Sequence, residues 1–253
     1  MLYLIGAGIG ENDISVGSIE ACGKASKVYY ESYTSLISES KVRFISDNIG
    51  KPMEGLPRER LEEESMQIVK EAKHSDIAII FSGDPLIATT HKIIFINAKK
   101  EGVPVTIMHS SSVLSAAIGE SGLDFYRFGK VATISRWTDS YKPVSFYDSI
   151  EANQQNNLHT LLLLDYMPES GSSMQLTEAL RILKEAENHY GKGIIKAGMK
   201  MFAMVNLGME KQQKLYLTIE ELEKADVEKG PACIILPARL SDIEEEIISS
   251  MFY

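Results

Sequence analysis

The sequence is poor in the residues that mark several classes of protein. Among 253 residues it has two cysteines, Cys22 and Cys233, which lie far apart in apolar surroundings. A disulfide scaffold is therefore not indicated, and a reducing compartment, the cytoplasm, is expected. The five histidines and two cysteines show no ligand spacing, so no metal site is predicted.

Basic residues and long apolar runs are also scarce. The 26 lysines and arginines are outnumbered by 35 acidic residues, and the formal net charge is -9. This balance disfavours direct binding of nucleic acid, which needs a basic face. No run approaches the roughly 18 apolar residues of a membrane span, and the start, MLYLIGAGIG, lacks the basic region of a signal peptide. We therefore expect no membrane partner.

Short apolar runs alternate with helical patterns through the first half of the chain. This alternation predicts a mainly parallel sheet with right-handed crossovers. The predicted strands are 2–8, 27–33, 76–83 and 103–110, and the predicted helices are 15–26, 58–73, 89–102 and 112–119. Ser15 is a plausible N-cap of the first helix.

The second half has more mixed patterns. Strands are predicted at 129–135, 158–165, 200–208, 214–218 and 232–238, with helices at 176–190, 218–225 and 240–252. The fold class is therefore α/β, with two α/β domains at 1–120 and 121–253 that join near Gly119 to Gly129.

The glycine turn LIGAGIGENDIS, which follows the first strand, admits three interpretations. Glu31 lies roughly where the ribose-binding acid of a dinucleotide site belongs. However, the spacing is G-x-G-x-G, and Glu11 and Asp13 precede the helix signal, where two acids would repel a pyrophosphate. In the second interpretation, the turn only allows two loops to pack closely. In the third, its backbone lies close to a different ligand.

Two further loops follow predicted strands at their carboxyl ends, where α/β proteins hold ligands. In FSGDPLIATTH, Asp84 and Pro85 have the pattern of a helix start, which does not explain Thr89, Thr90 and His91. In HSSSVLS a nucleophile elbow is absent. Its serines are better explained as caps of a helix start, with the backbone of the turn free to touch a ligand.

These loops coincide with the motifs of one family. The chain resembles the diphthine synthases, of the tetrapyrrole-methylase class of S-adenosylmethionine-dependent methyltransferases. The matching pieces are YLIGAGIGENDISV, YYESYTS, GDPLIATTH, HSSSVLSA with GLDFYRFGK, and LHTLLLLD. Enzymes that methylate porphyrin or corrin precursors share the early glycines and GDP but not ESYTS or ATTH. The match weakens after Pro168, and Ala232 stands where the family pattern has a histidine.

The resemblance implies two α/β domains with S-adenosylmethionine held in a cleft between them, and a homodimer. Carried over position by position, it implies cofactor contacts at Ile9, Asp84, Ile87, Ser112, Val113, Leu164, Leu207 and Ala232. It implies no metal and identifies no catalytic residue. Methyl transfer is an in-line displacement, which needs alignment and a dry site more than an acid.

The implied substrate is translation elongation factor 2. The enzyme would methylate the amino group of a modified histidine to give diphthine, a step of diphthamide biosynthesis. Three alternatives remain open. They are methylation of a tetrapyrrole precursor, a dinucleotide-dependent oxidoreductase, and a catalytically silent partner of the translation machinery.

Overall fold

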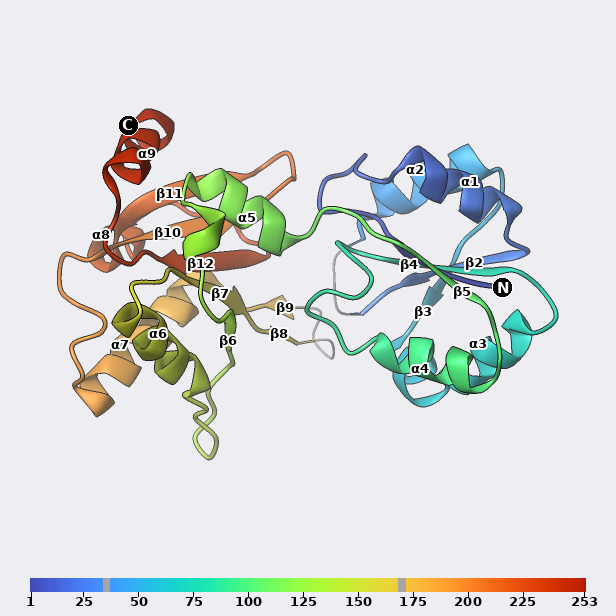
Figure 1. The fold of residues 1–253 in the computed structure, drawn as a ribbon, viewed down its shortest axis with the longest axis horizontal. Helices are drawn as coiled ribbons and strands as arrows, with labels where there is room; N and C mark the ends of the chain where they lie inside the picture. The colour runs from blue at the N-terminus through green and yellow to red at the C-terminus, as the bar shows by residue number, and fades with distance from the viewer. Residues whose placement is uncertain (34–36, 168–171) are drawn as a thin grey trace. The chain divides into compact units, whose positions relative to one another are not determined.

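The computed structural model describes residues 1–33, 37–167 and 172–253, which fall into two compact units, and each is described by itself. The first unit runs from Met1 to Val113, and the second comprises 114–167 and 172–253. Figure 1 shows a sheet with helices in each unit, as the α/β prediction requires.

Unit 1 is a five-stranded parallel sheet in the order β3-β2-β4-β1-β5. The predicted parallel sheet is thus confirmed. The strands are β1 (Leu2–Gly6), β2 (Lys27–Glu31), β3 (Glu54–Leu56), β4 (Ile77–Phe81) and β5 (Val105–Met108). The helices are α1 (Val16–Lys24), α2 (Glu39–Ile49), α3 (Ser65–Ala72) and α4 (Lys92–Lys100), with a π-helical turn η1 (Glu59–Glu63) before α3.

Alternate residues of the buried strands face two separate cores, because successive side chains of a strand point to opposite faces. Ile77 and Ile79 of β4 join the core beneath α3 and α4, whereas Ala78 and Ile80 join the core beneath α1 and α2. The two pairs of helices therefore cover opposite faces of the sheet (Figure 1). This three-layer arrangement leaves the carboxyl ends of the strands as the edge where the loops gather.

Several predicted elements of unit 1 differ from the structure. The helix predicted over 58–73 is broken at Glu64, where η1 gives way to α3. Asp84 and Pro85 do not start a helix, since 84–91 forms turns and α4 begins only at Lys92. Ser15 is an N-cap as predicted, and its hydroxyl accepts from Ser18 N.

Unit 2 contains a mixed five-stranded sheet in the order β11-β10-β12-β7-β6. Only β6 and β7 are parallel, and the other neighbours run antiparallel. The strands are β6 (Ala132–Ile134), β7 (Thr160–Leu164), β10 (Lys200–Val205), β11 (Gln213–Thr218) and β12 (Ala232–Leu236), with a separate pair β8 (Tyr166–Met167) and β9 (Ser172–Ser173).

The helices of unit 2 are α5 (Val113–Ser121), α6 (Ser145–Gln155), α7 (Leu176–Tyr190), α8 (Ile219–Leu222) and α9 (Asp242–Phe252), with a 3-10 turn η2 (Phe125–Arg127). One core lies between the sheet and α6, α7 and α8. The strand predicted over 200–208 ends at Val205, because Asn206 has a φ of 53° and turns the chain.

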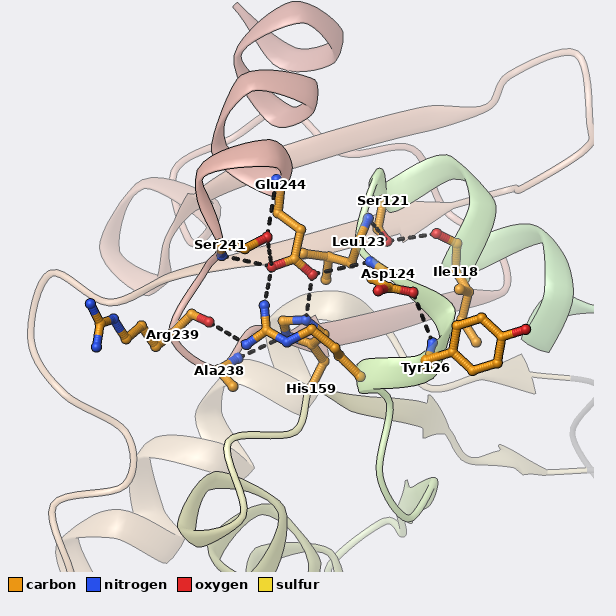
Figure 2. Close-up of polar contacts among 11 residues, drawn as sticks. Ile118, Ser121, Leu123, Asp124, Tyr126, His159, Ala238, Arg239, Ser241 and Glu244 are labelled. Carbon is orange, nitrogen blue, oxygen red and sulfur yellow. Dashed lines mark hydrogen bonds and ion pairs between the residues drawn. The ribbon is translucent and has the colours of Figure 1, made fainter.

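A buried polar cluster joins the start of the final helix, α9, to the rest of unit 2 (Figure 2). Glu244 of α9 accepts hydrogen bonds from Ser241 N (2.8 Å), Asp124 N (3.1 Å) and His159 Nε2 (2.9 Å), and it is also paired with Arg127. The reciprocal bonds between Ser241 and Glu244 form a capping box. The cluster thus joins the start of α9 to residues more than 80 positions earlier in the chain.

Candidate functional site at the carboxyl edge of the sheets

Two glycine-containing loops are bonded to each other at the carboxyl edge of the unit 1 sheet. Gly8 N donates to Gly83 O at 3.1 Å, and Gly83 N donates to Gly8 O at 3.0 Å. Both glycines have positive φ, 68° and 65°, which side chains other than glycine rarely adopt. A Cβ on Gly6 would lie 2.5 Å from Gly83 O. The glycines therefore bring the loop after β1 against the loop after β4.

The carboxylate of Asp13 accepts hydrogen bonds from backbone amides of the glycine turn. Its Oδ2 accepts from Ile9 N at 3.2 Å and from Gly10 N at 3.4 Å, and it also accepts from the Ser111 hydroxyl. Burial opposes ionisation, but these hydrogen bonds hold the pKa of Asp13 below its ordinary value. Because a carboxylate already takes the donors that a pyrophosphate would need, the turn is not built as a dinucleotide site.

Lys41 of α2 fixes the carbonyl side of the same turn. Its buried ammonium donates to Ala7 O, to Gly8 O at 3.2 Å and to Gly10 O at 2.6 Å. Burial lowers the pKa of Lys41, while the nearby carboxylates of Asp13 and Glu11 favour its charged form. Lys41 and Asp13 together determine the shape of the turn that carries Ile9. No sequence pattern marks Lys41, because its role depends on how α2 packs.

Asp84 connects the loops after β4 and β5. Its Oδ1 accepts from Leu86 N at 3.0 Å, and its Oδ2 accepts from Ser110 N at 3.3 Å and pairs with His109 Nδ1 at 2.7 Å. The bond to Leu86 N stabilises a turn and not a helix start. Both carboxylate oxygens of this buried side chain thus have partners within the protein.

The polar side chains of the ATTH motif form hydrogen bonds with other residues of unit 1. Thr89 Oγ1 lies 2.5 Å from His91 Nδ1, and His91 Nε2 lies 3.2 Å from Tyr33 Oη and 3.5 Å from Glu31 Oε1. Thr90 Oγ1 donates to Glu62 at 2.7 Å. Glu31 is buried beside His91, so it does not stand as an open ribose-binding acid. Thr34 and Ser35 of ESYTS lie outside the described residues.

The five implied cofactor contacts of unit 1 follow strands at one edge of its sheet, four of them in loops and Val113 as the first residue of α5. Ile9 follows β1, Asp84 and Ile87 follow β4, and Ser112 and Val113 follow β5. Asp84 is buried, Ile87 is exposed, and the other three are half-buried. Ile9 is held beside the third loop, because its amide also donates to Ser111 Oγ at 3.2 Å.

The three implied contacts of unit 2 also fall along one sheet edge. Leu164 ends β7, and Ala232 begins β12, whose next residue pairs with Leu163. Ala232 pairs in turn with Val205, the last residue of β10, and Leu207 follows two positions later. At Ala232 the strand presents a methyl group where the family pattern has an imidazole.

Among residues 1–33, 37–167 and 172–253, no three histidine, cysteine or acidic side chains gather as metal ligands. Cys22 and Cys233 are both buried and unpaired by disulfides, and burial raises the pKa of each thiol to about 12. Neither thiol is therefore a reactive nucleophile. Within the same described residues, no helix is long and apolar enough to cross a bilayer.

Comparisons with known proteins agree with this arrangement of loops. The model of the family "Tetrapyrrole (Corrin/Porphyrin) Methylases" matches residues 1–223. A diphthine synthase of Methanocaldococcus jannaschii is 35% identical over 251 residues, which cover 98% of this chain and 97% of the relative. An Arabidopsis thaliana protein named "Probable diphthine methyl ester synthase" is 33% identical and covers 100% of this chain and 99% of its own.

Solved structures of similar proteins have the same fold. A crystal structure of diphthine synthase superimposes with a TM-score of 0.87 at 30% identity, and it covers 99% of this chain and 95% of its own. The similarity therefore spans both sheets and every loop described above. The chain belongs to the tetrapyrrole methylase family and, within that family, to the diphthine synthases.

Proposed function

We propose that this S-adenosylmethionine-dependent methyltransferase acts on translation elongation factor 2. It methylates the amino group of a modified histidine to give diphthine, a step of diphthamide biosynthesis. The observation that carries this proposal is full-length similarity to diphthine synthases, including 35% identity over 98% of the chain. The occupied amides of the glycine turn support a methyl donor over a dinucleotide, because Asp13 already accepts from Ile9 N and Gly10 N.

The residues that we propose as contacts of the methyl donor are those that the family resemblance implies in each unit. For unit 1 we propose contacts from Ile9, Asp84, Ile87, Ser112 and Val113. Because both carboxylate oxygens of Asp84 are engaged within the protein, its contribution is to hold the loops that carry Ile87 and Ser112. When bound, S-adenosylmethionine supplies an activated methyl group on a cationic sulfonium.

For unit 2 we propose contacts from Leu164, Leu207 and Ala232, which lie along one edge of its sheet. The apolar character of these three side chains suits the purine ring and the methylene groups of the donor. It also helps to keep water from the methyl group, which in-line transfer requires. We further propose that the protein is cytoplasmic and forms a homodimer, which light scattering of the purified protein would test.

The decisive experiment is mass spectrometry of elongation factor 2 that carries the aminocarboxypropyl histidine, after incubation with the enzyme and S-adenosylmethionine. Successive mass increments of one methyl group are expected, confined to the peptide with the modified histidine. Mild alkali separates the two kinds of product, since it removes an ester methyl but leaves methyl groups on nitrogen. A parallel reaction with a porphyrin or corrin precursor tests the alternative substrate. Methylation of that precursor and not of the factor would refute the proposal.

A further inference from the structure

His109 is the most exposed of the residues that hydrogen bond to Asp84, the carboxylate that joins the loops after β4 and β5. Its side chain is 67% exposed, whereas the carboxylate of its partner Asp84 is 6% exposed. The two groups are joined at 2.7 Å through His109 Nδ1. A buried carboxylate paired with an accessible imidazole is an arrangement that activates histidine for proton transfer.

The hydrogen bonds determine which ring nitrogen is available. An ionised aspartate only accepts, so His109 Nδ1 carries the proton that it donates to Asp84. In the neutral ring the lone pair then lies on Nε2. Among the residues that the structure describes, none is hydrogen bonded to Nε2 of His109. Nε2 is therefore a proton acceptor, and it lies on the side of the ring opposite to Asp84.

The pair is held in place by backbone as well as by side chains. Leu86 N and Ser110 N both donate to Asp84, one from each of the two loops that the carboxylate joins. His109 lies three residues before Ser112 in the chain, and Asp84 lies three residues before Ile87. The exposed imidazole is thus fixed in the same loops that are proposed to bind the methyl donor.

Methylation of an amine requires such an acceptor. A protonated amine has no lone pair with which to attack, so one proton must leave nitrogen for each methyl group added. We propose that His109 Nε2 is the general base, aligned by Asp84, and this inference rests on the proposed function. His109 takes a proton from the substrate ammonium, and the freed lone pair forms the N–C bond. The C–S bond breaks, its electron pair stays on sulfur as S-adenosylhomocysteine forms, and His109 returns the proton to solvent.

The test compares His109→Ala with the wild-type enzyme and with His74→Ala, a matched control at an exposed histidine after α3. Methyl transfer to elongation factor 2 and calorimetric binding of S-adenosylmethionine are measured on each. For His109→Ala, kcat is expected to fall by about a hundredfold or more while the donor affinity stays within about twofold. Added imidazole should restore part of kcat in that variant alone, since a free base can replace the missing one.

Two results would overturn the inference. One is a kcat of His109→Ala within about threefold of the wild type. The other is a loss of kcat that imidazole does not restore and that parallels a loss of donor affinity, which would make His109 a structural tie between loops. The wild-type reaction separates this failure from that of the proposed function. If the wild-type enzyme does not methylate elongation factor 2, the proposed function itself fails.

Discussion

Replacing Glu244 with glutamine should destabilise unit 2 while leaving the loops of unit 1 intact. The Glu244 carboxylate is 3% exposed and accepts from two backbone amides, from Ser241 Oγ, from His159 and from Arg127. Although burial alone would raise it, these donors lower the pKa of Glu244 from 4.5 to about 2. Glutamine keeps one acceptor oxygen but loses the charge, and its amide group faces donors.

The pKa sets the magnitude and the pH window. The difference between 4.5 and about 2 corresponds to about 3 kcal/mol of folding free energy at neutral pH. Because the pKa is lower in the folded state, this contribution is fully present above pH 4.5 and is lost as the pH falls toward 2. The stabilities of the wild type and Glu244→Gln should therefore converge in acid.

The contribution of His159 to stability also falls as the pH falls, but for a different reason. Burial lowers its pKa, and its Nδ1 accepts from Ala238 N at 2.9 Å, which requires the neutral ring. Its contribution is present above pH 6.5 and is lost as the pH falls below that value in both proteins. Because Glu244 accepts from His159 Nε2 and favours the charged form of that ring, the difference between wild type and variant near pH 6.5 reports the pair, whereas the difference that disappears between pH 4.5 and 2 reports Glu244.

Thermal and urea unfolding at neutral pH and below pH 4.5 would measure the effect, with Glu246→Gln as the control at an exposed position of α9. At neutral pH we expect a loss of about 3 kcal/mol, or roughly 6–12 °C in melting temperature, for Glu244→Gln. A change below about 1 kcal/mol, equal to that of the control, would refute the reasoning, because a buried carboxylate with five donors cannot be neutral to stability.

Three further predictions concern the unit 1 loops and metal dependence. Lys41→Met should cost about 1–3 kcal/mol, because the buried Ala7 carbonyl loses its donor. It should also weaken S-adenosylmethionine binding about tenfold or more, and unchanged affinity in calorimetry would contradict this. Asp84→Asn should weaken donor binding about ten- to a hundredfold, because asparagine has one acceptor oxygen and cannot accept from both Leu86 N and Ser110 N, which hold the two loops together. Each such bond to a charged group is worth roughly 1.5–3 kcal/mol, and equal affinities would show that the loops do not depend on both bonds. Methyl transfer should persist in a strong chelator, whereas activity lost there and restored by one metal ion would disprove a metal-free site.

Local patterns in the sequence determined the elements and the class of fold. The alternation of apolar runs with helical patterns predicted the parallel sheet of unit 1, because each buried strand must be followed by a crossover helix. Ser15 was recognisable as a cap because capping uses residues within one turn of each other. The same logic failed at Asp84, since an aspartate before a proline also stabilises a simple turn.

The short elements were harder to predict. The strand β3 has three residues, too few for an alternation to be read, and the helix predicted over 58–73 is interrupted at Glu64. Helices α2 and α6 were also missed although each has 11 residues, because most of the stability of such a helix comes from its packing and not from local propensity.

The partners of the site residues were decided only by the tertiary structure. The sequence singled out Asp84, Thr89 and His91 by their positions after a strand, and the family motifs supplied the implied contacts. It did not reveal that Lys41 donates to the glycine turn or that Asp84 aligns His109. These pairs are separated by 25 or more positions, and they meet because helix α2 packs on the sheet and β4 and β5 flank β1. Hydrogen bonds over such separations depend on which elements become neighbours, and local periodicity carries no information about that choice.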